Sequence, residues 1–177
     1  EICKKNTEVL LSNEDRQPME SLPFANFFQR IVLVSGSSEH VRQDAKMLEH
    51  LGLPVERAIA SGKEALSFLL EQPCDLVLLD SALDDMEGLA LLKAIRRDKR
   101  LKKLPVLMVT PDNDRETVLA AIAAGCTGYV LRPYSSKIFI RHLSTATQLA
   151  RYKEIELHQL EYSKELTESG FHEDAIE

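Results

Sequence analysis

The sequence has few cysteines, no excess of basic charge and no long apolar run, and each absence excludes a class of protein. Its three cysteines are far apart and form no CxxC motif, which argues against a disulfide framework or zinc site and favours a reducing cytosol (Cys3, Cys74, Cys126). A net charge of −6 provides no electrostatic footprint for nucleic acid and no basic patch for an anionic membrane. No apolar run reaches the length of about 18 residues that spans a membrane, and no secretory h-region is visible. We therefore expect a cytoplasmic protein that binds neither nucleic acid nor a membrane through these residues.

Common catalytic signatures are missing as well. The chain contains no GxSxG, GxGxxG or P-loop glycine pattern. Its five histidines form no HExxH motif and no tight pair with carboxylates, so we interpret all of them as surface residues (His40, His50, His142, His158, His172). These observations predict that the chain is not an enzyme.

The length of 177 residues suits one domain of about 100 to 150 residues with extensions. Residues 1–29 show little regularity and are predicted to be an N-terminal extension, in which Phe24, Phe27 and Phe28 form a helical turn that docks on the core. Residues 30–150 are the predicted domain, and 151–177 a helical extension or linker. The chain starts at Glu1 rather than Met, so we expect a fragment of a longer protein.

Strand and helix patterns alternate five times across the domain. Short apolar runs predict strands over 31–34, 55–60, 75–80, 105–110 and 127–131. Helical patterns between and after them cover 39–51, 62–71, 87–97, 113–124 and a stretch from about 135 past 160. Ser61 and Glu64 form a capping box, Asn113 and Glu116 a plausible cap pair, and Gly125 ends a helix.

This alternation predicts an α/β fold with a doubly wound, five-stranded parallel sheet of the flavodoxin-like type and an extended C-terminal helix. In such sheets, functional groups gather beyond the carboxyl ends of the strands. The polar residues at those positions are Ser35 and Gly36, Asp80, Thr110 and Arg132. Any functional site is therefore expected among them.

The residues at these strand ends resemble those of the receiver domain of two-component response regulators. Leu78-Leu79-Asp80 ends the third strand, and Gly88, Thr110 and Arg132 follow Asp80 by 8, 30 and 52 residues. These intervals match the usual spacing of the family, and the resemblance covers about 120 residues on five βα units. A single apolar run ending in aspartate would be a weak signal, but the complete set in register is specific.

The resemblance implies that Asp80 accepts a phosphoryl group from a histidine kinase or phosphotransfer protein. In the family, Mg²⁺ neutralises the charge that builds up when a carboxylate attacks a phosphate. An acidic pair after the first strand helps to hold this ion. A lysine after the fifth strand contacts the phosphate, and Thr110 and Tyr129 take the switch positions.

This chain departs from the family at two of those places. Ser35 and Gly36 stand where the acidic pair is expected, which removes two carboxylates and makes Mg²⁺ binding doubtful. Arg132 replaces the lysine, and either contacts phosphate or pairs with Asp80. Asp84 or Asp85 is the candidate to replace a lost metal ligand; the alternative is that both are solvated loop carboxylates.

We therefore predict a signalling receiver that acts through protein contacts on its fourth helix, fifth strand and fifth helix, or through dimerisation. An apolar stripe on the last helix supports a homodimer or a linker to an output domain, which the sequence does not identify (Leu143, Ala146, Ala150, Leu157, Leu160). The alternatives are a phosphorylation-independent pseudo-receiver, a phosphatase and a flavodoxin-like ligand binder. Ala82 argues against the phosphatase, which needs a second aspartate there. Only the loop at residues 35–38 favours the ligand binder.

Overall fold

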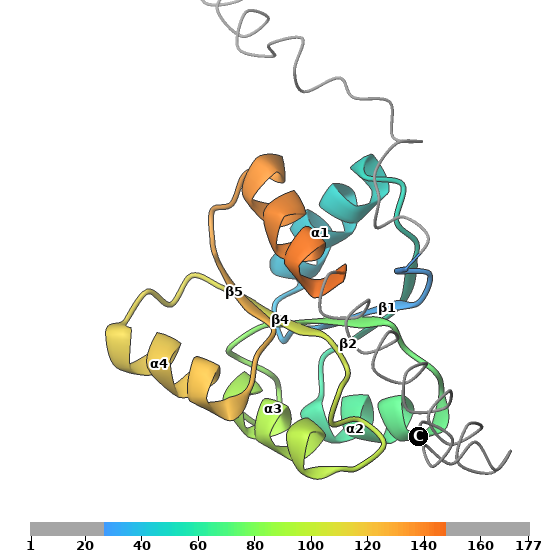
Figure 1. Cartoon of the computed structure of the whole chain (residues 1–177), viewed down its shortest axis with the longest axis vertical. Coiled ribbons are helices and arrows are strands. Elements are labelled where there is room, and N and C mark those ends of the chain that lie inside the picture. Colours follow the sequence, from blue (N-terminus) through green and yellow to red (C-terminus); the bar gives the residue numbers. More distant parts are fainter. Residues whose placement is uncertain (1–26, 148–177) are drawn as a thin grey trace, which may run out of the picture.

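Five short strands form one parallel sheet at the centre of the domain (Figure 1). They are β1 (Ile31–Val34), β2 (Val55–Ile59), β3 (Leu76–Leu79), β4 (Val106–Thr110) and β5 (Gly128–Leu131). Their order in the sheet is β2-β1-β3-β4-β5, and every neighbouring pair is parallel. This computed structural model describes residues 27–147, and the doubly wound sheet expected from the sequence is confirmed there.

Helices cover both faces of this sheet (Figure 1). One face carries α1 (Ser38–His50) and a helix over residues 136–147, while the other carries α2 (Gly62–Glu71), α3 (Gly88–Arg97) and α4 (Arg115–Ala124). Successive strand residues point alternately to the two faces, so Ile31 and Leu33 join one apolar cluster while Val32 and Val34 join the other. Both faces of the central strands are buried, which is why their sequences are uninterrupted apolar runs.

Capping residues in the sequence predicted two helix ends correctly. Ser61 caps α2 by accepting a hydrogen bond from the Glu64 amide, and Gly125 ends α4 with a φ of 95°. The cap predicted at Asn113 is wrong, because Asp114 accepts the hydrogen bond from the Thr117 amide. A carboxylate suits this position, since the exposed amides of a helix N-terminus carry partial positive charge.

The folded core begins earlier than the sequence suggested. Phe28 is 1% exposed and packs in the cluster on the α1 face, although it lies in the predicted N-terminal extension. The backbone amides of Gln29 and Arg30 both donate to the Asp75 carboxylate, which fixes this entry segment. Phe28 does dock on the core as predicted, but from a turn rather than a helix, and Phe24 lies outside the described residues.

The last described helix belongs to the same core. It begins close to the predicted residue 135, and Leu143 and Ala146 are fully buried against the sheet. The rest of the predicted stripe lies outside the described residues (Ala150, Leu157, Leu160). Within residues 27–147, no helix combines the length and apolar character needed to cross a membrane.

Candidate functional site at the carboxyl edge of the sheet

Asp80 lies directly after β3, at the centre of the carboxyl edge, and is 4% exposed. Its backbone amide donates to the Val34 carbonyl, continuing the β1–β3 ladder by one residue. Gly88, the first residue of α3, packs against the Asp80 carbonyl so closely that a side chain there would collide with it. Both contacts fix where the carboxylate points, and they explain why glycine stands eight residues after Asp80.

Both carboxylate oxygens of Asp80 are hydrogen-bonded within the chain. Oδ2 accepts a 2.8 Å bond from the Ser35 hydroxyl and lies 2.5 Å from the Nδ1 atom of His40. Oδ1 accepts a 2.7 Å bond from the Ser81 amide. Because an ionised carboxylate is an acceptor only, Nδ1 of His40 must carry the hydrogen. Neither oxygen is left without a donor.

His40 is the residue that the sequence analysis missed. Ser37 caps α1, and its hydroxyl accepts a hydrogen bond from the His40 amide, so His40 lies in the first turn of the helix that follows β1. That turn faces the carboxyl edge and brings the imidazole to Asp80. The interpretation of His40 as a surface residue is therefore wrong. The sequence signal that could have revealed His40 is its position in the first turn of the helix that directly follows β1.

Ser35 and Gly36, which stand in place of the acidic pair, make structural contacts around Asp80 and its loop. Ser35 is buried and bonds Asp80, while the Gly36 amide donates to the Ala82 carbonyl over 3.0 Å. A Cβ atom at residue 36 would lie 3.1 Å from both Ala82 O and the Asp84 carboxylate, so a side chain fits poorly there. The Asp84 carboxylate lies beside Gly36, and none of the hydrogen bonds to the Asp80 carboxylate comes from Asp84.

The Asp85 carboxylate is bound at the N-terminus of α2, and its support of a metal at Asp80 stays a prediction. Its carboxylate accepts hydrogen bonds from the Gly62 amide (2.6 Å), the Ser61 hydroxyl (2.9 Å) and the Lys63 amide (3.2 Å). These bonds, led by that from Gly62, hold the pKa of Asp85 below its usual value. The residue reinforces the N-terminus of α2.

The donor set around Asp80 does not fit Mg²⁺. This ion prefers a near-octahedral shell of oxygen ligands, commonly with more than one carboxylate. Here the side chains bonded to Asp80 Oδ2 are a hydroxyl and an imidazole, and the Ser81 amide bonds Oδ1, so no second carboxylate bonds this group. Across residues 27–147, no three side chains of His, Cys, Asp or Glu are grouped to hold a metal ion.

Arg132 binds Asp44 of α1, not Asp80. The guanidinium donates from Nη1 to Oδ1 over 2.9 Å and from Nη2 to Oδ2 over 2.7 Å, and the Tyr134 hydroxyl donates to Oδ1 over 2.6 Å. Burial tends to lower the pKa of Arg132, but the hydrogen bonds and charge of Asp44 outweigh it and raise this pKa. Two roles were predicted for Arg132, contact with a phosphate and pairing with Asp80. The structure shows no direct hydrogen bond between Arg132 and Asp80. Asp44 was missed, although it lies one helical turn after His40.

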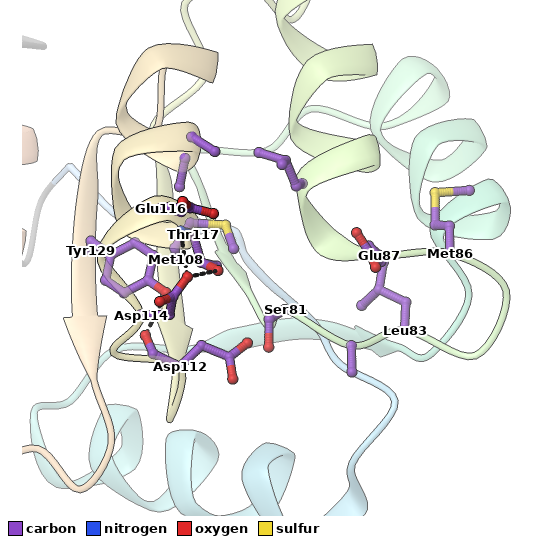
Figure 2. A pocket seen from close by; sticks show the side chains of 14 residues that line it. Ser81, Leu83, Met86, Glu87, Met108, Asp112, Asp114, Glu116, Thr117 and Tyr129 are labelled. Carbon is purple, nitrogen blue, oxygen red and sulfur yellow. Dashed lines mark hydrogen bonds between the residues drawn. The ribbon is translucent and has the colours of Figure 1, made fainter.

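Thr110 and Tyr129 connect to Asp80 through a chain of hydrogen bonds. The buried Thr110 hydroxyl donates to Ser81 Oγ over 2.8 Å, and the Ser81 amide bonds Asp80. The Asp112 amide donates to Thr110 Oγ1, and the Tyr129 hydroxyl donates to the Asp112 carbonyl over 2.7 Å. The predicted switch residues thus lie in one continuous network with the aspartate, and Figure 2 shows Ser81, Asp112 and Tyr129 along one pocket.

Comparison with known proteins agrees with this geometry. The model of the response regulator receiver domain matches residues 31–144. The chain is 35% identical over 109 residues to the chemotaxis protein CheY of Pseudomonas aeruginosa, covering 62% of this chain and 88% of that protein. It is 36% identical over 107 residues to the chemotaxis protein CheY-3 of Vibrio cholerae, covering 60% of this chain and 82% of that protein.

A solved structure supports the same conclusion. The chemotaxis protein CheY4 of Vibrio cholerae superposes with a TM-score of 0.60 at 25% identity, covering 67% of this chain and 98% of that one. The chain therefore belongs to the response regulator receiver family.

Proposed function

We propose that this receiver domain transmits a two-component signal through protein contacts that do not require Mg²⁺-dependent phosphorylation of Asp80. The observation that carries the proposal is the double hydrogen bond at Asp80 Oδ2, from Ser35 and from His40. Asp80 keeps its position in the fold, but its carboxylate is bound by its own chain.

The chemistry of phosphoryl transfer explains why this arrangement matters. A carboxylate oxygen that attacks phosphorus needs an accessible lone pair and cations that neutralise the incoming phosphoryl group. In this domain, His40 and Ser35 both bond Oδ2 of Asp80, and Arg132 is held by Asp44. The hydrogen bonds that Ser35 and His40 make to Oδ2 reduce the availability of this oxygen as a nucleophile.

An apolar surface on α4, β5 and the helix over 136–147 supports a role in protein contacts. Leu119 and Ile122 of α4 are 52% and 57% exposed, and Leu131 and Ile138 are each 43% exposed. Large exposed apolar patches are typical of interaction sites, and we propose that these four side chains contribute to one. Receiver domains in general contact histidine kinases or phosphotransfer proteins and are typically signalling modules rather than enzymes. We assign this surface to a protein partner, with a second copy of the chain as the other candidate.

The first experiment tests the state of Asp80. The protein is incubated with Mg²⁺ and acetyl phosphate, and its intact mass is measured beside the Asp80→Asn variant. We expect no added phosphoryl group in either protein, and no change in fluorescence or NMR spectra with beryllofluoride. Stoichiometric phosphorylation that Asp80→Asn abolishes would contradict the proposal and favour an ordinary phosphorylated receiver.

A gain-of-function variant sharpens this test. Ser35→Asp combined with His40→Ala restores one carboxylate at the acidic-pair position and removes the imidazole from Asp80 Oδ2. We expect this double variant to bind Mg²⁺ more tightly than the parent protein, as measured by NMR line broadening with Mn²⁺. Equal metal affinity of the two proteins would mean that Ser35 and His40 are not what excludes the ion.

The contact surface is tested by oligomeric state and partner binding. The substitutions Leu119→Ser and Ile122→Ser remove apolar area from α4, and Val55→Ser removes an exposed apolar side chain from β2 at the opposite edge of the sheet. We expect the α4 pair to abolish self-association or kinase binding in sedimentation velocity, while the β2 control leaves it intact. Equal effects of both changes would refute the assignment.

A further inference from the structure

A pocket of about 700 Å³ opens beside the Asp80 site, between the loop that follows β3 and the N-terminal part of α4 (Figure 2). Its apolar lining includes Leu83 and Met108, and the half-buried ring of Tyr129 forms part of its wall. Asp80 does not line it, whereas Ser81, Asp112 and Tyr129 of the Asp80 network do. The pocket therefore adjoins the Asp80 site and shares side chains with its hydrogen-bond network.

The charged side chains at this pocket are all acidic. Glu87 stands on the side of the β3–α3 loop, and Asp112 and Glu116 stand on the side of α4, as Figure 2 shows. No lysine, arginine or histidine is among the residues that line the pocket. Among the described residues, no ion pair joins Glu87, Asp112 or Glu116 to a basic side chain.

Two further observations concern the acidic side chains near the pocket. Glu87 is the N-cap residue of α3 but makes no side-chain cap bond, so its carboxylate is not used to stabilise the helix. Burial first, and then the carboxylate of Asp112, raise the pKa of Tyr129 above its usual value. The lining holds carboxylates and no cation, together with the apolar side chains of Leu83 and Met108.

We propose that this pocket binds a short segment of a partner protein in which basic side chains stand on either side of apolar ones. Lysine or arginine residues would pair with Glu87 on one side and with Glu116 on the other, and the apolar residues between them would cover Leu83 and Met108. A cationic group over the ring of Tyr129 adds an attraction of the cation–π type. The proposal goes beyond the function proposed above and holds whether or not Asp80 is phosphorylated.

The position of Ser81 gives such a ligand a route to the receiver site. Ser81 lines the pocket, accepts the Thr110 hydroxyl hydrogen bond and donates its amide to Asp80. A bound segment therefore touches the residue that joins the aspartate to the predicted switch residue. Occupancy of the pocket is expected to shift the amide resonances of Ser81 and Thr110.

The test uses a blocked hexapeptide with the order alanine, arginine, leucine, leucine, arginine, alanine, titrated into the ¹⁵N-labelled full chain. The control peptide carries glutamate in place of both arginines. We expect the basic peptide alone to bind, with NMR shifts at Ser81, Leu83 and Tyr129, and with an affinity that falls as salt is raised.

Two matched double variants test whether the carboxylates of the pocket bind the peptide. Glu87→Gln with Glu116→Gln removes two carboxylates from the pocket, and Glu49→Gln with Glu56→Gln removes two exposed carboxylates from α1 and β2. The pocket variant is expected to weaken peptide binding about tenfold, whereas the control stays within about twofold. The proposal is overturned by no binding at millimolar peptide, by equal binding of the acidic peptide, by equal effects of the two variants, or by shifts that leave Ser81 unmoved.

Discussion

The ion pair between Asp44 and Arg132 provides the sharpest test of the structure, because it joins α1 to the segment after β5. We expect Asp44→Ala to lower the free energy of unfolding by roughly 3 to 5 kcal/mol. The side chains of Arg132 and Asp44 are only 6% and 5% exposed, so water cannot replace the lost carboxylate. The variant would leave the guanidinium without both of its 2.7 and 2.9 Å bonds, and the Tyr134 hydroxyl without its acceptor.

The size of this loss in the free energy of unfolding reflects the removal of only one partner of a buried ion pair. A single truncation leaves an uncompensated charge inside the protein, whereas replacing both partners with apolar side chains removes that charge and its desolvation cost. We therefore expect the double variant Asp44→Leu with Arg132→Met to recover most of the loss. Tyr134→Phe removes one hydrogen bond and is expected to cost about 1 kcal/mol.

Urea denaturation of the full chain, followed by circular dichroism, measures all of these values. With a slope of about 1 to 3 kcal/mol per molar urea, the single variant is expected to unfold at a clearly lower urea concentration than the parent. Glu49→Gln, an exposed change on the same helix, serves as the control and is expected to stay within about 0.5 kcal/mol. A loss below about 1 kcal/mol for Asp44→Ala would show that Arg132 does not depend on Asp44, and would reopen its pairing with Asp80.

Three further predictions concern pH, backbone packing and thiol reactivity. Burial, followed by the hydrogen bond to Asp44, raises the pKa of Tyr134 well above its usual value. The stability from this raised pKa is complete below the unfolded-state value of about 10 and is lost as pH rises through the folded-state value, so Tyr134→Phe should flatten the decline seen in urea midpoints above pH 10. Gly88→Ala drives a methyl group into the Asp80 carbonyl, and we expect a loss of about 1 to 3 kcal/mol in thermal unfolding, with an unchanged midpoint as the contrary result. Burial raises the pKa of the Cys74 thiol to about 11, so alkylation by iodoacetamide at pH 8 should be at least about tenfold slower in the folded protein than in urea, as read by peptide mass mapping.

Much of the fold was predictable because its signals are local. Parallel strands buried on both faces require continuous apolar runs, and those at 31–34 and 106–110 were visible without any structure. Ser61 and Gly125 marked helix ends through backbone chemistry that acts over only a few residues. The error at Asn113 was of one residue, because two neighbouring side chains were both suitable caps and only the helix geometry selects between them.

The position of Asp80 also followed from the sequence, because spacing along parallel strands determines which residues reach the carboxyl edge. What surrounds its carboxylate did not follow. His40 and Ser35 are 40 and 45 residues from Asp80, and Arg132 lies 88 residues from Asp44. No local pattern encodes which of several polar side chains at one edge will pair.

The sequence by itself therefore determined the receiver fold, the aspartate at the end of β3 and the loss of its acidic partners at Ser35 and Gly36. Only the tertiary structure decided that His40 bonds the aspartate and that Arg132 turns away to Asp44. The physical reason is that strand and helix formation depend on neighbouring residues, whereas the pairing of buried charges depends on distances that exist only after the sheet and its helices have packed.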